Sequence, residues 1–227
     1  MSISIRYLGH ASIVIKNGPQ NIYIDPSTKD TGLRKDDFGP SDLTLVTHGH
    51  ADHCDPDLVK KIRKGGTPIL APENCRKELG KAGGLWPLNP GGLMQMGDGT
   101  RIRAVPAYNL KRVRPSGEPF HPKGMGSGYL LFINNKRIFH AGDTELVPEW
   151  AELGDMLLGV DVALLPCDGI YTMNVDEAVD AAIALNPKVV IPMHVRSADP
   201  KAFKEKVESK SKIRVVILQK GQEHTLE

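Results

Sequence analysis

The chain opens with a regular alternation of polar and apolar residues. Residues 2–7 and 11–16 alternate with a period of two, and residues 20–24 follow an Asn17-Gly18 pair. Alternation of this kind predicts half-buried strands, and Asn-Gly is typical of a two-residue hairpin turn. The N-terminal part of the chain therefore predicts an antiparallel meander of three strands.

Beyond the meander, short apolar runs alternate with amphipathic stretches. Strands are predicted over residues 43–46, 68–71, 101–105, 128–133, 137–140, 160–165, 189–191 and 213–218, with one or two more within 83–100. Helices are predicted after the capping residues Asp55, Asn174 and Asp199, and as shorter pieces over 73–81 and 148–153, with Gly65 closing the first of them. Residues 27–42 and 109–127 read as long loops. The pattern predicts an α/β fold of two mixed sheets with helices outside, in a single domain over residues 1–227 without an internal repeat.

Composition narrows the class of protein only slightly. The 227 residues are 40% hydrophobic and 25% charged, with a net charge of +2, so a sizeable core is expected and a nucleic-acid partner is not. The three cysteines are far apart in the sequence and do not indicate a disulfide framework. Residues 1–6 alternate like a strand rather than a signal peptide, and no apolar run has the length of a membrane span. We therefore expect a cytoplasmic protein with no membrane partner.

One short turn concentrates most of the chemistry. It follows the buried strand predicted at 43–46 and precedes the helix that begins at Asp55-Pro56, a position where α/β folds commonly bind ligands. Its polar side chains are His48, His50, Asp52 and His53. Imidazole and carboxylate groups are the usual ligands of zinc, iron and manganese, and four of them at one place predict a metal site.

The turn resembles the HxHxDH motif of the metallo-β-lactamase superfamily. Further motifs appear in the order typical of that family: Ile24-Asp25-Pro26 before the turn, and Ala141-Gly142-Asp143-Thr144 and Pro192-Met193-His194 after it. The resemblance covers most of the chain, from Gly9-His10 to His194. Within the superfamily the chain is similar to small lactonase-like hydrolases related to ascorbate-6-phosphate lactonase. The resemblance implies an αββα sandwich with two divalent metal ions, zinc above all and manganese or iron as alternatives.

The same resemblance implies a role for each polar residue. One ion is expected on His48, His50 and His121, the other on Asp52, His53 and His194, with Asp143 bridging the two. Asp25 is expected either to hold the HxHxDH turn or to serve only as a turn residue. His10 is expected near the site or, equally, as a surface or core histidine.

The chain departs from the commonest family pattern at one position. A further histidine ligand is expected after the strand that ends near residue 105, but the sequence there is Ala107-Tyr108-Asn109. His121, in a Phe-His-Pro-Lys-Gly segment, offers an imidazole 12 residues beyond Asn109. Asn109 and His121 therefore stay open as replacements for the missing ligand.

The expected activity is hydrolysis by a hydroxide that bridges two metal ions and attacks a carbonyl or phosphoryl centre, with Asp52 orienting it and accepting its proton. The loop after Asn109 carries four cationic side chains, Lys111, Arg112, Arg114 and Lys123. If this loop recruits the small-molecule substrate, the substrate is expected to be anionic. If the loop is only a solvated face, it does not indicate the charge of the substrate. Alternatives are a phosphodiesterase or ribonuclease, a di-iron redox protein and a non-catalytic binding protein. A homo-oligomer is expected.

Overall fold

The computed structural model describes residues 2–226, which divide into two compact units. The first comprises the chain up to Asn89 together with the C-terminal segment from Leu218, and the second runs from Pro90 to Ile217. Each unit contains one seven-stranded sheet. The fold class predicted from the sequence, two mixed sheets with flanking helices, is confirmed.

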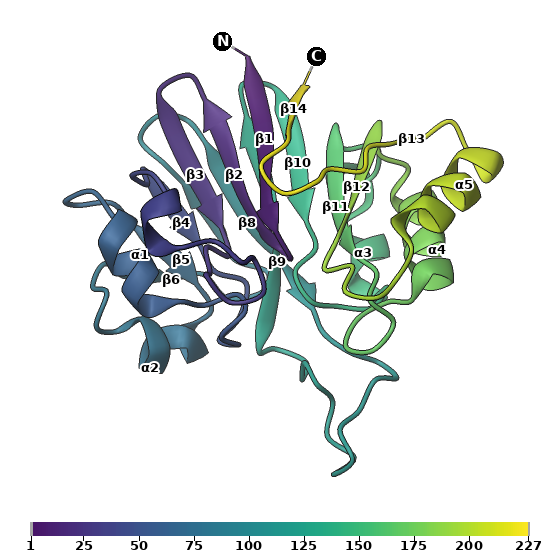
Figure 1. Cartoon of the computed structure of the whole chain (residues 1–227), viewed down its shortest axis with the longest axis horizontal. Coiled ribbons are helices and arrows are strands. Elements are labelled where there is room, and N and C mark those ends of the chain that lie inside the picture. Colours follow the sequence, from purple (N-terminus) through teal and green to yellow (C-terminus); the bar gives the residue numbers. More distant parts are fainter. Residues whose placement is uncertain (1, 227) are drawn as a thin grey trace. The chain divides into compact units, whose positions relative to one another are not determined.

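The sheet of the first unit combines an antiparallel and a parallel half. Its strands, in spatial order, are β14 (Glu223–Leu226), β1 (Ile3–Gly9), β2 (Ser12–Asn17), β3 (Gln20–Ile24), β4 (Leu43–Leu45), β5 (Ile69–Ala71) and β6 (Leu85–Pro87). Pairing is antiparallel from β14 to β3 and parallel from β3 to β6 (Figure 1). The unit also holds the helices α1 (Pro56–Ile62) and α2 (Arg76–Leu79), and the 3₁₀ turns η1 (Lys35–Asp37) and η2 (Glu73–Cys75). The predicted N-terminal meander is therefore confirmed.

Helix α1 begins where its capping signals place it, because the Asp55 carboxylate accepts a hydrogen bond from the Leu58 N–H at 3.0 Å. The expectation that Gly65 closes this helix is wrong. The helix ends at Ile62, and Arg63 has extended backbone angles because it forms a β-bridge with Ser41. A contact with a residue distant in sequence thus ends the helix before the glycine is reached.

The sheet of the second unit has the same division into halves. Its strands, in spatial order, are β13 (Arg214–Val215), β12 (Val189–Met193), β11 (Val162–Pro166), β10 (Lys136–His140), β9 (Gly126–Ile133), β8 (Arg101–Ala107) and β7 (Leu93–Gln95). Pairing is antiparallel from β7 to β10 and parallel from β10 to β13. The helices are α3 (Glu149–Glu152), α4 (Val175–Leu185) and α5 (Pro200–Lys210), with a 3₁₀ turn η3 (Gly154–Met156). Helices α4 and α5 pack side by side and contact β11 and β13 (Figure 1).

Strand β8 is longer than the sequence indicates. The prediction stopped before Pro106, yet the strand continues to Ala107, and Pro106 pairs with Ser127 of β9. On the other side of β8 the backbone hydrogen bonds reach only to Ala104, so the missing N–H of proline leaves no ladder bond unmade there. Beyond β8 the chain forms a long loop that projects from the ends of β8 and β9 (Figure 1).

The two units repeat one topology, although the sequence shows no repeat. Each has an antiparallel meander followed by parallel strands, with parallel pairing starting at β3–β4 in one unit and at β10–β11 in the other. The predicted last strand is shortened to Arg214–Val215, and β14 follows it to pair with β1 of the first unit. The single-domain expectation stays a prediction.

Candidate metal centre

In the first unit the polar residues gather at one end of the parallel strands. The Asp25 N–H donates to the Leu45 carbonyl at 2.9 Å, so the segments that leave β3 and β4 run side by side. The HxHxDH turn follows β4, between Thr47 and His53. The carboxyl ends of adjacent parallel strands therefore place Asp25 beside the turn.

The Asp25 carboxylate holds this turn together. It is fully buried, and it accepts the Thr47 N–H and the Thr47 hydroxyl, each at 2.7 Å. His53 Nδ1 lies 2.7 Å from Asp25 Oδ2. Because a carboxylate only accepts, the hydrogen of a neutral His53 ring is on Nδ1, and Nε2 carries the lone pair. Asp25 is thus an orienting partner of His53, in addition to being a turn residue.

The same reasoning fixes the ring of His48. Its Nδ1 lies 3.0 Å from Thr47 Oγ1, whose own hydrogen is donated to Asp25. His48 Nδ1 must then be the donor, and its Nε2 presents a lone pair. That Nε2 lies 3.0 Å from Nδ1 of His50, so the two imidazoles converge with the nitrogens that a metal ion would use.

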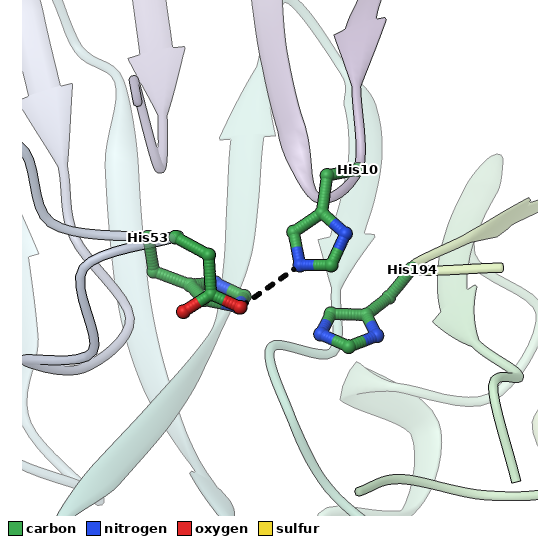
Figure 2. Close-up of side chains that lie close together, drawn as sticks. His10, His53 and His194 are labelled. Carbon is green, nitrogen blue, oxygen red and sulfur yellow. Dashed lines mark hydrogen bonds and ion pairs between the residues drawn. The ribbon is translucent and has the colours of Figure 1, made fainter. Parts of the chain in front are cut away.

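His10 contacts the aspartate of the turn. Its Nε2 lies 3.1 Å from Asp52 Oδ2, the contact marked by the dashed line in Figure 2. The Tyr7 hydroxyl donates to the His10 carbonyl at 2.8 Å, which ties His10 to the end of β1. His10 is 8% exposed and therefore lies in the interior, in contact with a predicted ligand.

In the second unit the polar residues again follow consecutive parallel strands. Asp143 comes after β10, Asp168 after β11 and His194 after β12. All three are at least 95% buried. His194 Nδ1 lies 3.1 Å from Asp168 Oδ2, and His194 Nε2 lies 3.2 Å from Asp143 Oδ2.

Asn109 and His121 interact directly with each other. The Asn109 Oδ1 lies 2.9 Å from His121 Nδ1 and accepts the His121 N–H at 2.8 Å. The Asn109 Nδ2 donates to the Tyr171 carbonyl at 2.9 Å, which fixes which amide atom faces the ring. His121 Nδ1 must therefore be the donor, and His121 Nε2 lies 3.2 Å from Asp143 Oδ2.

One carboxylate oxygen of Asp143 thus faces Nε2 of two imidazoles, and each Nδ1 atom lies close to another acceptor oxygen, Asn109 Oδ1 at 2.9 Å for His121 and Asp168 Oδ2 at 3.1 Å for His194. Neutral rings in this arrangement direct two lone pairs at a negative oxygen, which is repulsive as it stands. A cation between each ring and the carboxylate turns the repulsion into coordination. The donor set of the second unit therefore fits divalent metal ions.

Asp168 is ionised at neutral pH, which makes it a hydrogen-bond acceptor. Burial raises the pKa of its carboxyl, but hydrogen bonds from His194 and from the Thr172 and Ile170 N–H groups outweigh burial and bring the pKa to about 2. Asp168 is not among the site residues that the sequence predicts. The only signal was an aspartate three residues beyond the buried strand predicted at 160–165, and a turn residue gives the same signal.

The cations of the loop after Asn109 are mostly engaged with carboxylates. The Arg112 guanidinium donates to Glu145 at 2.9 Å and to Glu177 at 2.5 Å. Glu145 also accepts the Leu110, Lys111 and Arg112 N–H groups, at 2.9, 2.9 and 3.1 Å, which anchors the start of the loop. Lys123 pairs with Glu149 at 2.6 Å. These pairs neutralise much of the charge that the sequence suggested for anion recruitment.

The structure therefore places the predicted site residues in two sets. The first unit holds His10, Asp25, His48, His50, Asp52 and His53, and the second holds Asn109, His121, Asp143 and His194. Within each unit the members contact one another as described above. None of the helices in residues 2–226 combines the length and apolar character needed to cross a lipid bilayer.

Comparison with known proteins agrees with this fold and this chemistry. The sequence model of the β-lactamase superfamily domain matches residues 4–194. A metal-dependent hydrolase of the UPF0173 family from Pyrococcus abyssi is 34% identical over 231 residues, which cover 97% of this chain and 98% of the relative. Igni18, a metallo hydrolase from the archaeon Ignicoccus hospitalis, is 29% identical, with a TM-score of 0.80 over 100% of this chain and 99% of its own.

A crystal structure of a protein from Parabacteroides distasonis in the same class gives a TM-score of 0.83 at 32% identity, over 95% of this chain and 92% of that one. Fold and donor set together define a metal-dependent hydrolase. The chain belongs to the metallo-β-lactamase superfamily, and within it to the UPF0173 family of metal-dependent hydrolases.

Proposed function

We propose that this hydrolase uses two divalent metal ions to cleave a lactone or phosphoester bond of a small molecule. The observation that carries the proposal is the pair of 3.2 Å approaches of His121 Nε2 and His194 Nε2 to one oxygen of Asp143. A carboxylate between two imidazoles, each held in its tautomer by a further acceptor, is suited to bridging two cations.

The proposed ligands come from both donor sets. One ion is assigned to His48, His50 and His121, and the other to Asp52, His53 and His194, with Asp143 shared. The match of the superfamily domain to residues 4–194 supports this assignment, because it spans every one of these residues. Zinc is the preferred ion for imidazole-rich sets, and manganese and iron suit the same donors.

Two bound divalent ions supply Lewis acidity and water of lowered pKa. The protein supplies orientation and proton transfer. Asp52 is assigned to orient the attacking water and to accept its proton on a carboxylate oxygen. The 3.1 Å contact from His10 Nε2 supports this role, since it fixes the direction of the Asp52 carboxylate. Asn109 is assigned to orient His121, and Asp25 to orient His53.

An anionic small molecule is the proposed substrate. Lys111 and Arg114 are exposed cations of the loop that carries His121, with Lys111 Nζ 3.6 Å from Glu177 Oε1, whereas Arg112 is committed to its two glutamates. The proposed compartment is the cytoplasm, because Cys54, Cys75 and Cys167 are buried free thiols. Burial raises the pKa of all three thiols, to about 12 for Cys75 and Cys167, so that they stay protonated.

Metal analysis combined with a hydrolysis panel tests the proposal. The wild-type protein is expected to bind two ions per chain and to hydrolyse members of a panel of lactones, phosphodiesters and thioesters. Asp143→Ala is expected to lower metal affinity by about 100-fold or more and to abolish the activity, because both ions lose a ligand.

His224→Ala is the matched control, since His224 lies on β14 and outside the proposed ligand set. It is expected to keep both ions and full activity. Circular dichroism verifies that each variant is folded. A folded Asp143→Ala protein that binds two ions as tightly as the control contradicts the assignment.

A further inference from the structure

Asp168 makes two sets of contacts in the second unit, one through each carboxylate oxygen. Its Oδ1 accepts the N–H groups of Ile170, Tyr171 and Thr172, each at 2.9 Å, and the Thr172 hydroxyl at 3.0 Å. Its Oδ2 lies 3.1 Å from His194 Nδ1. One oxygen therefore shapes the turn after β11, and the other contacts an imidazole at the end of β12.

The turn shaped by Asp168 continues to the second imidazole. The Tyr171 carbonyl accepts Asn109 Nδ2 at 2.9 Å, and Asn109 Oδ1 in turn lies 2.9 Å from His121 Nδ1. The Tyr171 ring also meets the ring of Phe120, the neighbour of His121, edge to face at 4.9 Å between centroids. Two independent contacts thus join the 168–172 turn to the segment that carries His121.

We propose that Asp168 is a positioning residue that orients both imidazoles facing Asp143: His194 directly, and His121 through the Tyr171 carbonyl and Asn109. The inference rests on the proposed function. It adds that one buried carboxylate, which binds no metal itself, sets the tautomer and direction of a ligand in each of the two metal sites. Partners of this kind typically change metal affinity by about 10–100-fold when they are removed.

The two connections are separable by substitution. In Asp168→Asn the side-chain oxygen still accepts the backbone N–H groups, because asparagine forms the same turn as aspartate. The amide nitrogen then faces His194 Nδ1, so that a donor meets a donor and the tautomer of His194 is no longer held. Asp168→Ala removes both oxygens, and Asn109→Ala interrupts only the connection to His121.

The experiment measures the affinities of both ions in the full-length protein, by competition of Zn²⁺ with a chromophoric chelator. Asp168→Asn is expected to lower the affinity for one ion about 10–100-fold and to leave the affinity for the other unchanged. Asn109→Ala is expected to lower only the other affinity, the one that Asp168→Asn leaves unchanged. Asp168→Ala is expected to lower both affinities. Asp180→Asn, an exposed aspartate on α4, is the control with no expected change.

A second readout does not depend on affinity. In ¹H–¹⁵N spectra of the histidine side chains of the zinc-loaded protein, the His194 Nδ1–H resonance is expected in wild type and in Asn109→Ala, and is expected to be lost in Asp168→Asn. A carboxylate that merely shapes its turn predicts unchanged spectra and unchanged affinities in Asp168→Asn, which would overturn the inference. The inference would also be overturned by an Asp168→Ala protein that circular dichroism shows to be folded and whose affinity is lowered for only one of the two ions.

Failure of the proposed function gives a different result. A wild-type protein that binds fewer than two ions contradicts the two-ion proposal and this inference together. A wild-type protein with two ions, whose affinities do not change in the Asp168 variants, contradicts this inference alone.

Discussion

Three polar residues at the candidate metal centre have left-handed backbone angles that non-glycine residues seldom adopt. The φ angles of His10, Asp25 and His194 are 55°, 50° and 49°. Each directly follows the last residue of a strand. Such angles cost of order 1–3 kcal/mol each and persist only where the surroundings enforce them. Here they turn the side chain away from the strand direction and toward its partners, Asp52 for His10, His53 for Asp25 and Asp143 for His194.

A single carboxylate outside the site allows a test of pH dependence. Asp161 precedes β11 and accepts hydrogen bonds from Lys188 Nζ at 2.7 Å and from the Arg137 N–H at 2.8 Å. Burial raises the pKa of Asp161, but these two donors outweigh burial and hold the pKa below its usual value. Its contribution to the free energy of unfolding is therefore complete above about pH 4, the value in the unfolded chain, and is lost as the pH falls through the lower folded pKa.

We expect Asp161→Asn to lower the free energy of unfolding by about 1 kcal/mol at pH 7, since Lys188 is largely exposed and its charge is screened. Below pH 4 the difference from wild type is expected to shrink. Urea unfolding of both proteins between pH 3 and 7 measures it, with Asp180→Asn as the exposed control. A difference that stays constant with pH contradicts the role assigned to the ionised carboxylate.

At the scale of elements, helix α4 shows how local signals and the site are connected. Asn174 caps the helix by accepting the Glu177 N–H at 2.9 Å, and the Glu177 side chain accepts the Asn174 N–H at 2.9 Å. The sequence predicted this capping box. It did not predict that the Glu177 carboxylate also accepts a hydrogen bond from the guanidinium of Arg112, in the loop after β8. The helix start thereby helps to hold the loop that carries His121.

We expect Asn174→Ala to lower the free energy of unfolding by about 1 kcal/mol, which for a chain of this size lowers the melting temperature by about 2–4 °C. The reason is the loss of the acceptor for the Glu177 N–H. Differential scanning calorimetry measures the change. Asn174→Ser keeps a capping oxygen and is expected to stay within a few tenths of a kcal/mol of wild type. Equal losses in both variants contradict the capping role.

At the scale of the whole molecule, the two units share one topology while carrying different donor sets. The first contributes a compact HxHxDH turn after one strand. The second holds Asp143 and His194 after two of its parallel strands, and His121 in a long loop. The parallel half of each sheet thus supplies polar side chains at its carboxyl edge, which is where open parallel sheets bind ligands.

The two tryptophans give a probe for each unit, because Trp86 lies on β6 in the first unit and Trp150 lies on α3 in the second. If residues 1–227 form one domain, Trp86→Phe and Trp150→Phe proteins are expected to report a single common unfolding transition. Zinc at about 100 times its Kd is expected to raise the free energy of unfolding seen by both probes by about 2.7 kcal/mol. Fluorescence-monitored urea titration, with and without zinc, makes the measurement. Separate midpoints, or stabilisation of only one probe, contradict the single-domain prediction.

Local chemistry made much of this protein predictable from its sequence. The period-two alternation, the Asn17-Gly18 turn and the caps at Asp55, Asn174 and Asp199 each depend on neighbours within a few residues, and the corresponding elements are present. His48, Asp143 and His194 were recognisable because each belongs to a short motif that resembles those of the metallo-β-lactamase superfamily. Strand β14 was missed because its four residues pair with β1, more than 200 positions away.

The sequence by itself determined the class of fold and the set of imidazoles and carboxylates that can bind metal. The reason is that strand periodicity, helix capping and the short polar motifs depend only on residues close together in the chain. Only the tertiary structure decided the relation between Asn109 and His121, since that relation depends on which amide atom faces Tyr171 and which ring nitrogen faces Asp143. It also brought in Asp168, whose partners lie on other strands and loops. Hydrogen-bond direction between segments far apart in sequence has no counterpart in the order of the residues, and here it is what orients the imidazoles.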